Sequence, residues 1–126
     1  MAITQDSVGY LWIGAVQGLL RFDGQSISTY QHVANDPNSL PSSKIDKLFV
    51  DRSKNILICT SGGLCKYNPE LDNFSPIITE TNLRGASGLY ISAIAEDKSG
   101  QLYIASQNTI YRLNNSQNLF SKVTEL

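Results

Sequence analysis

Asp6-Ser7-Val8-Gly9-Tyr10-Leu11-Trp12-Ile13-Gly14 is the stretch that decides the fold, because the chain repeats its pattern twice. The later copies are Asp51-Arg52-Ser53-Lys54-Asn55-Ile56-Leu57-Ile58-Cys59 and Asp97-Lys98-Ser99-Gly100-Gln101-Leu102-Tyr103-Ile104-Ala105. The second copy starts 45 residues after the first, and the third starts 46 residues after the second. A period of this length is typical of a four-stranded propeller blade.

The residues that follow each copy repeat as well. They are Gly18-Leu19-Leu20-Arg21-Phe22-Asp23, Gly63-Leu64-Cys65-Lys66-Tyr67-Asn68 and Thr109-Ile110-Tyr111-Arg112-Leu113-Asn114, and a later aromatic recurs at Tyr30, Phe74 and Phe120. The apolar runs are short, aromatic or β-branched, and broken by turn residues, which favours strands. Helical repeats would instead need long amphipathic runs, and the sequence has none.

Each repeat therefore predicts four strands. The innermost strand is expected at Ile45–Val50 and Ile91–Glu96, and the second at Leu11–Ala15, Ile56–Thr60 and Leu102–Ser106. The third begins after Gly18, Gly63 or Thr109, and the fourth ends near Tyr30, Ile78 and Val123. We predict an all-β partial β-propeller of about three four-stranded antiparallel blades, at about 1–34, 45–80 and 91–126.

A tight turn between the first two strands opens with Asp6, Asp51 or Asp97. A side-chain carboxylate at that place can accept the backbone N–H two residues later. Gly9 and Gly100 suit the positive φ that closes such a turn. The second repeat has Lys54-Asn55 there, and we expect Asn55 to adopt the positive φ, because asparagine tolerates it next best after glycine. One aspartate per blade leaves the three far apart, so we predict turn caps and no metal site.

Composition limits the function classes. The chain has 126 residues, 41% hydrophobic, with a formal net charge of -1, which argues for one folded domain and against a nucleic-acid-binding surface. There is no polybasic segment and no apolar run of about 20 residues, so we predict no membrane contact by this segment. The first residues, Met1-Ala2-Ile3-Thr4-Gln5-Asp6, do not form a signal peptide.

The two cysteines, Cys59 and Cys65, fall in neighbouring predicted strands. Nothing nearby supplies the remaining ligands of a structural zinc site. We interpret them as two small apolar residues of a hairpin, with a cross-strand disulfide as the alternative.

The repeats quoted above resemble those of the two-component regulator propeller family. The first two match well, whereas the third lacks the Gly-Leu pair. In that family such repeats build the periplasmic sensor region of hybrid two-component histidine kinase/response regulators of Bacteroides type, which respond to oligosaccharides. The resemblance thus implies a periplasmic, ligand-sensing fragment whose kinase parts, if any, lie outside this chain.

Ligand recognition in propellers belongs to loops held on a rigid scaffold. Two longer loops, about Gln31–Lys44 and Thr79–Tyr90, interrupt the repeat. Within them His32, Arg84 and Tyr90 have the chemistry to bind a polar ligand, although each is also an ordinary surface residue type. Trp12 is expected to pack between blades, and Arg21, Lys66 and Arg112 to face solvent or a neighbouring blade.

Two other function classes stay open. A propeller lyase or hydrolase would need a positioned base, but the single histidine, His32, has no nucleophile or paired carboxylate in a recognisable motif beside it. We therefore predict no enzymatic activity and no cofactor. A protein-interaction scaffold is the second alternative.

Propellers have about 4–8 blades, so three repeats cannot close one. We expect the apolar blade faces to be covered either by the remaining blades of a parent protein or by self-association, with two chains giving a six-bladed homodimer.

Overall fold

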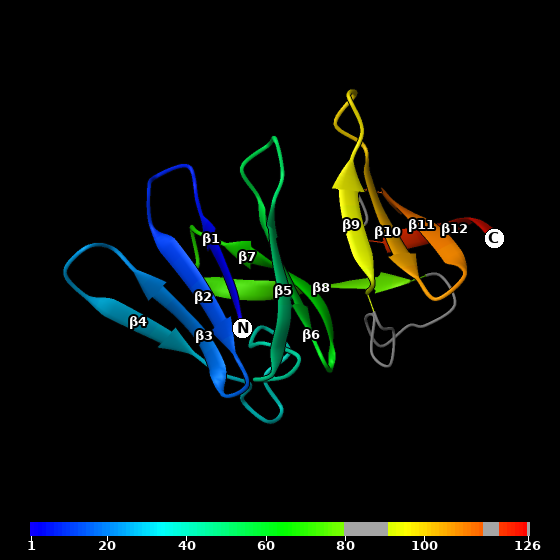
Figure 1. Ribbon diagram of the computed structural model, residues 1–126. Coiled ribbons are helices and arrows are strands. Elements are labelled where there is room, and N and C mark those ends of the chain that lie inside the picture. The colour runs from blue at the N-terminus through cyan, green and yellow to red at the C-terminus, as the bar shows by residue number, and fades with distance from the viewer. Residues whose placement is uncertain (80–90, 115–118, 126) are drawn as a thin grey trace.

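The computed structural model describes residues 1–79, 91–114 and 119–125, which form twelve strands in three blades (Figure 1). Blade 1 contains β1 (Ala2–Gln5), β2 (Leu11–Ala15), β3 (Gly18–Phe22) and β4 (Ile27–Tyr30). Blade 2 contains β5 (Ile45–Val50), β6 (Ile56–Thr60), β7 (Gly63–Asn68) and β8 (Asn73–Thr79). Blade 3 contains β9 (Ala93–Glu96), β10 (Leu102–Ser106), β11 (Thr109–Asn114) and β12 (Leu119–Glu125). No helix in these ranges has the length and apolar character needed to span a membrane.

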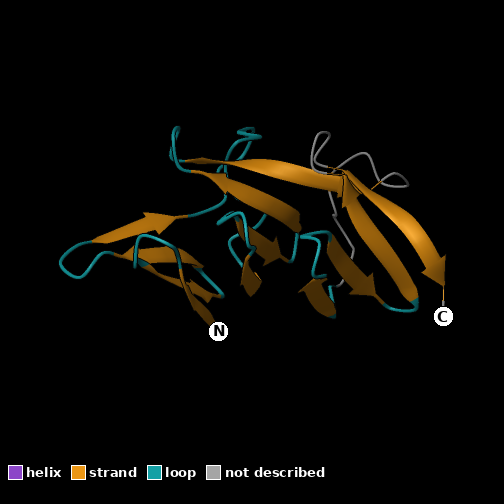
Figure 2. Cartoon of the chain, turned by 90° about the horizontal axis from the view of Figure 1, so that it is seen from above, coloured by secondary structure: helices purple, strands orange, loops and turns teal. Residues whose placement is uncertain are grey.

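Each blade is a four-stranded antiparallel sheet in which sequence neighbours pair. The blades lie side by side in chain order, and they do not close into a ring (Figure 2). Blades 2 and 3 also meet at their outermost strands, where β8 and β12 pair in parallel at Ile78–Leu119 and Thr79–Phe120. The all-β partial propeller predicted from the repeats is confirmed.

The predicted strands agree closely with the observed ones. All three second strands have the predicted bounds, and the third strands begin at Gly18, Gly63 and Thr109. The inner strand of blade 3 begins at Ala93, two residues later than predicted, and the outermost strands of blades 2 and 3 run on to Thr79 and Glu125. Of the second long loop, 80–90 lies outside the described residues.

The repeated aspartates cap the turns, as predicted. Asp6 Oδ1 accepts the backbone N–H of Val8 at 3.0 Å, and Asp97 Oδ1 accepts that of Ser99 at 2.9 Å. In blade 2 the carboxylate of Asp51 instead accepts the N–H of Asn55, at 2.8 Å. The assignment of the positive φ to Asn55 is wrong, because Lys54 adopts it (φ 71°), at the position equivalent to Gly9 and Gly100.

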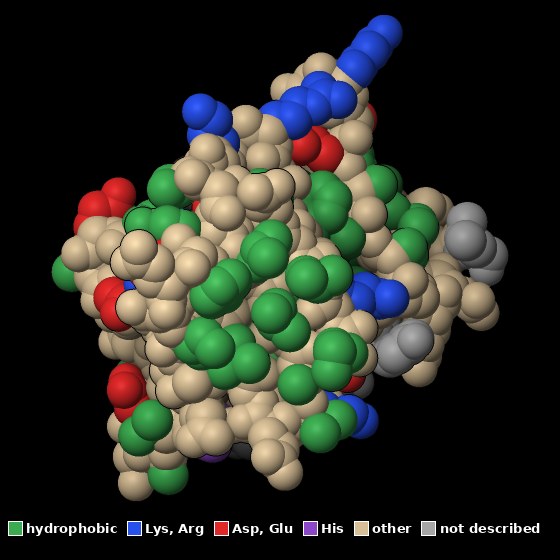
Figure 3. All heavy atoms as spheres, turned by 60° about the vertical axis from the view of Figure 1, so that its left-hand side comes forward, with side chains coloured by type: hydrophobic (Ala, Val, Ile, Leu, Met, Phe, Trp, Pro, Cys, Tyr) green, Lys and Arg blue, Asp and Glu red, His purple; other side chains and the backbone are tan. Residues whose placement is uncertain are grey.

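Blades 1 and 2 pack through an apolar layer between their facing sides. Trp12 and Leu19 of blade 1 are fully buried against a set from the blade 2 side: Leu40, Ile45, Ile56, Ile58, Cys65, Tyr67 and Phe74. The interblade position predicted for Trp12 is therefore confirmed. On the opposite side of β2, Leu11, Ile13 and Ala15 are only half-buried, and Figure 3 shows hydrophobic side chains gathered on this side of the molecule.

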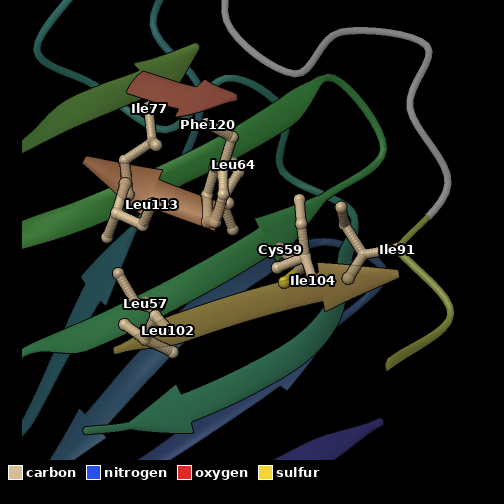
Figure 4. Close-up of a cluster of buried hydrophobic side chains, with 9 residues drawn as sticks. All are labelled: Leu57, Cys59, Leu64, Ile77, Ile91, Leu102, Ile104, Leu113 and Phe120. Atoms are coloured by element: carbon tan, nitrogen blue, oxygen red, sulfur yellow. The ribbon is translucent and has the colours of Figure 1, made fainter. Parts of the chain in front are cut away.

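Blades 2 and 3 pack in the same way through the other side of blade 2 (Figure 4). There Leu57 lies beside Leu102, and Cys59 lies beside Ile91 and Ile104. Because neighbouring residues of a strand point to opposite sides, all five residues of β6 are buried, alternately against blade 1 and blade 3.

The two cysteines are free and buried, so the disulfide alternative is wrong and the apolar interpretation is confirmed. Cys59 pairs with Leu64 and Cys65 pairs with Ile58, which places the two thiols on opposite sides of blade 2. Burial raises the pKa of Cys59 to about 12 and also raises that of Cys65, which keeps both thiols protonated at neutral pH.

Gly14 permits the closest approach between blades 1 and 2. A Cβ added there would lie 2.3 Å from Ile45 Cγ2 and 2.8 Å from Ile45 Cβ. We expect Gly14→Ala to lower the free energy of unfolding by about 1–3 kcal/mol, because the β5 side chain would have to move. Urea denaturation followed by circular dichroism measures this.

Val16→Ala is the control, because Val16 lies two residues after Gly14 and is 68% exposed. This substitution should change the free energy of unfolding by less than about 0.5 kcal/mol. Equal stability of the Gly14→Ala variant and the native chain would show that the blades are not packed this closely.

Candidate functional site

A groove with a volume of about 290 Å³ opens between blades 1 and 2 at the end where β1 turns into β2. Its walls come from that turn, from β2, β3, β6 and β7, and from the β5–β6 and β7–β8 turns. The lining residues are Asp6, Ser7, Val8, Tyr10, Trp12, Arg21, Lys54, Ile56, Tyr67 and Pro69. Aromatic, cationic and acidic side chains thus meet in one concave place.

Asp6 fixes the blade 1 wall of this groove. Its Oδ1 accepts three backbone N–H bonds, from Val8 and Gly9 at 3.0 Å and from Tyr10 at 2.9 Å. Its Oδ2 accepts the indole N–H of Trp12 at 2.8 Å. The turn can bring three N–H groups to one oxygen because Gly9 adopts φ 106°, which a residue with a Cβ rarely does. Tyr10 is thereby held half-buried at the groove.

Arg21 lies at the centre of the groove. Its guanidinium carbon is 5.3 Å from the centroid of the Tyr10 ring and 5.7 Å from that of Trp12, within the range of cation–π attraction. Its Nη1 donates to the Tyr67 hydroxyl across the blade boundary at 3.0 Å. Burial lowers the pKa of Arg21, but Tyr30, Tyr67 and Asp72 outweigh burial and raise it, so the group stays a cation.

Behind Arg21, two tyrosines from different blades share one carboxylate. Asp72 Oδ1 accepts the Tyr67 hydroxyl at 2.6 Å and the Tyr30 hydroxyl, from blade 1, at 2.7 Å. The Tyr67 and Tyr30 hydrogen bonds hold the pKa of Asp72 below its usual value, and burial raises the pKa of both tyrosines. Arg21 Nη1 lies 4.0 Å from the carboxylate, a weak ion pair because Asp72 is largely exposed. The network locks blade 1 to blade 2.

The arrangement suits binding of a polar ligand. The half-buried Tyr10 ring offers an apolar face, and Arg21, Lys54 and Ser7 offer hydrogen-bond donors around it. The one carboxylate in the lining, Asp6, already accepts four hydrogen bonds. Within residues 1–79, 91–114 and 119–125, no three His, Cys, Asp or Glu side chains gather as metal ligands would.

The loop residues predicted to bind ligand lie elsewhere or outside the described residues. His32 follows β4, in the loop at the opposite end of the blades from the groove (Figure 1). Its Nδ1 is 2.7 Å from the Leu40 carbonyl oxygen, which can only accept, so Nδ1 carries the proton and helps to order the loop. Arg84 and Tyr90 fall in 80–90, outside the described residues, so the three-residue site stays a prediction.

The sequence contains partial signals for the groove. Tyr10 lies within the first copy of the repeated motif, but Asn55 and Gln101 occupy its position in the other copies, so the repeat gives it no signal of its own. Arg21 recurs as Lys66 and Arg112, and of the two roles left open for it, facing solvent or facing a neighbouring blade, the bond to Tyr67 shows the second. Asp72 carried no signal, because it lies 42 residues from Tyr30 and the two meet only once the blades pack.

Solved structures share this fold. The extracellular domain of the putative hybrid two-component system BT3049 from B. thetaiotaomicron covers 100% of this chain with a TM-score of 0.76 and 24% identity. The corresponding domain of BT4673 from the same organism covers 99% with a TM-score of 0.74 and 21% identity. This chain spans 18% of the length of each sensor domain. Both are extracellular domains of putative hybrid two-component systems, the class of protein that the repeats resemble, and the likeness shows that the fold is shared.

A weaker likeness is to an enzyme. Virginiamycin B lyase from Staphylococcus aureus covers 91% of this chain with a TM-score of 0.62 and 16% identity, and the chain covers 38% of the lyase. No protein-family description and no curated protein matches the chain.

Removal of the Asp6 carboxylate should open the blade 1 wall. Asp6→Ala leaves three backbone donors and the buried Trp12 indole without their acceptor, so we expect a loss of about 1–3 kcal/mol in the free energy of unfolding. Urea denaturation followed by the fluorescence of Trp12, the single tryptophan, reports both stability and the environment of the indole.

The matched control is Asp23→Ala. Asp23 Oδ1 also accepts two turn N–H groups, from Gln25 and Ser26, but no buried side chain depends on it. Its loss should cost less than about 1 kcal/mol and leave the native emission spectrum unchanged. Similar losses from the two variants would contradict the structural role of Asp6.

The Asp72 carboxylate makes the contact between blades pH-dependent. Its folded pKa is lowered, so the ionised form stabilises the fold above the unfolded pKa of about 4, and that stability is lost as pH falls through the folded pKa. The stability difference between the native chain and Asp72→Asn should therefore be largest near neutral pH and shrink below about pH 4. Denaturation midpoints across this range measure it.

Glu70→Gln, on the same exposed turn, removes a neighbouring carboxylate and is the control for the change in charge. A difference between Asp72→Asn and the native chain that stays constant down to pH 3 would show that the Asp72 carboxylate is not held ionised by the two tyrosines.

Proposed function

We propose that this chain is part of an extracytoplasmic, ligand-sensing propeller of a two-component signalling protein, in the periplasm of a Bacteroides-type bacterium. Two observations support this: the repeated motif, and a fold shared over the whole chain with the extracellular domains of two sensors. Signal transfer would belong to other parts of the parent protein.

The ligand that we propose is an oligosaccharide bound in the groove between blades 1 and 2. Sugars present apolar ring faces and many hydroxyl groups, which fit a ring such as Tyr10 flanked by the donors of Arg21 and Lys54. The observation that carries this assignment is the preformed geometry. The hydrogen bonds to Asp6 and the bond from Arg21 to Tyr67 fix the walls of the groove through contacts within the protein.

The predicted loop site is a second candidate. His32, Arg84 and Tyr90 belong to the two sequence segments that join successive repeats. A parent propeller would have a recognition surface at each end, so both sites enter the test.

A non-catalytic role fits the groove chemistry. Its single carboxylate is fully engaged, and its cations lie beside aromatic rings and hydroxyl groups, with no nucleophile and base in contact in the lining. The likeness to the lyase makes turnover worth measuring. A protein-interaction scaffold is the remaining alternative, and it would bind through a broad surface.

The test is oligosaccharide binding by the purified chain. A glycan array with neutral and uronic-acid oligosaccharides selects ligands, and calorimetry measures their affinities. Tyr10→Ala should weaken binding about tenfold, because the stacking face is lost, whereas Tyr10→Phe should keep most of the affinity. Lys54→Ala tests the cationic edge, with the exposed Lys98 of the corresponding blade 3 turn, changed to Ala, as its control.

A combined His32→Ala, Arg84→Ala, Tyr90→Ala variant tests the loop site. Loss of binding only in this variant would move the site to the loops, and absence of any oligosaccharide binding would contradict the proposed function. Chemical change of a bound glycan would show an enzyme.

A further inference from the structure

The groove between blades 1 and 2 combines cationic side chains with a carboxylate that is already engaged. Its lining contains the cations Arg21 and Lys54 and one carboxylate, Asp6. Asp6 accepts three backbone N–H bonds at Oδ1 and the Trp12 indole N–H at Oδ2. The whole chain has 10 Lys and Arg against 11 Asp and Glu, so the excess of cations in the lining is a local feature of the groove.

Lys54 brings a side chain to a place where the other two repeats have none. It corresponds to Gly9 of blade 1 and Gly100 of blade 3, and the three residues adopt positive φ values of 71°, 106° and 88°. This conformation is unfavourable for a residue with a Cβ, and such residues cluster at functional sites. Lys54 is exposed, and no carboxylate of the described residues forms an ion pair with it. Its ammonium group is therefore available at the groove.

Arg21 keeps hydrogen-bond donors for a ligand. A guanidinium has five N–H groups. Arg21 donates one of them from Nη1 to the Tyr67 hydroxyl at 3.0 Å, and its Nη2 makes a longer contact of 3.5 Å with Ser28 Oγ. The side chain is 24% exposed and lines the groove, so a ligand there can reach the remaining donors. Arginine binds carboxylate and phosphate groups through two parallel N–H bonds, and sulfate offers its oxygens in the same arrangement as phosphate.

The neighbouring acidic side chains leave this lining without a free carboxylate. Asp72 lies 4.0 Å from Arg21 Nη1, but it lines a separate depression of about 240 Å³. Its Oδ1 accepts the hydroxyls of Tyr30 and Tyr67. The other acidic residues of the blade 1 and blade 2 turns also lie outside the lining: Asp23, Asp51 and Glu70. The groove thus offers cations and donors, but no carboxylate that could accept a hydrogen bond from a ligand.

We propose that the oligosaccharide bound in this groove is acidic, and that its carboxylate or sulfate group binds Arg21 and Lys54. The inference rests on the function proposed above and narrows the class of sugar. The hydroxyl groups of a neutral sugar both donate and accept, so their recognition uses acceptors as well as donors. An anionic group only accepts, which matches a lining whose single carboxylate is occupied.

The test compares matched ligands by calorimetry on the purified chain. One pair is a uronic-acid oligosaccharide and the same compound after reduction of its carboxyl groups to alcohols, which removes the charge and keeps the rings. The second pair is a neutral oligosaccharide with and without sulfate groups, so the two pairs distinguish carboxylate from sulfate. In at least one pair the charged member should bind about tenfold tighter, because hydrogen bonds to charged groups are the stronger ones. Added salt should weaken binding of the charged member more than that of its neutral counterpart.

Substitutions then locate the preference in the groove. Lys54→Gln should lower the ratio of the two affinities about fivefold, whereas Lys54→Arg, which keeps the charge, should retain most of it. Lys98→Gln is the matched control, because it removes one exposed cation from the β9–β10 turn, outside the groove lining, and should leave the ratio unchanged.

Arg21→Gln should abolish the preference, provided that circular dichroism shows a folded chain, since Arg21 also bonds to Tyr67 across the blade boundary. The Lys54 variants do not depend on that bond, because Lys54 is exposed, so the test stands if Arg21→Gln fails to fold.

Equal affinities within both pairs would overturn the inference and leave the proposed function standing, because the chain would still bind oligosaccharides. A preference that Lys54→Gln and Lys98→Gln lower equally would also overturn it, since any cation at this end would then suffice. A chain that binds no member of either pair, and no other oligosaccharide, would contradict the proposed function itself, and the inference with it.

Discussion

Packing between neighbouring blades is the contact on which the rest of this structure depends. A four-stranded sheet that is apolar on both sides exposes too much hydrocarbon to be stable alone, and blade 2 shows what it requires. All five residues of β6 are buried, alternately against blade 1 and blade 3. Burial of apolar surface contributes roughly 25 cal/mol per Å², so these two layers dominate the stability of the chain. The alternation of strand side chains thus links each blade to both of its neighbours.

The same contact creates the groove and its chemistry. Trp12 fills the layer between blades 1 and 2, and Asp6 holds its indole while shaping the turn that presents Tyr10. Arg21 occupies a position that recurs in every repeat. It differs from its equivalents because blade 2 places the Tyr67 hydroxyl where the guanidinium can donate to it. The equivalent Lys66 has Leu113 of blade 3 at the corresponding place, and the described residues include no blade that follows Arg112. A repeated sequence thus gives a unique site where the neighbouring blade differs.

Local patterns predicted the strands well, because strand bounds follow alternation and turn residues that lie close in sequence. The bounds of Leu102–Ser106, for example, follow from the residues of that strand and its two flanking turns. The site was harder to predict, because Asp72 gains its role from Tyr30 on another blade, and no local pattern records that meeting. The prediction at Asn55 failed for a related reason: its preference for a positive φ was outweighed by the repeat register, which places Lys54 there. His32 was predicted to bind ligand because it carries an imidazole, but its Nδ1 hydrogen-bonds to the Leu40 carbonyl oxygen of its own loop.

Hydrogen exchange, measured at a concentration low enough to keep the chain as a single copy, tests most directly whether each blade depends on its neighbours. If each blade depends on its neighbours, amides of β6 and β7, covered on both sides, exchange last, and those of β2 and β10, covered on one side, exchange earlier. Equal protection of β2, β6 and β10 would contradict it, because each blade would then owe its stability to its own sheet.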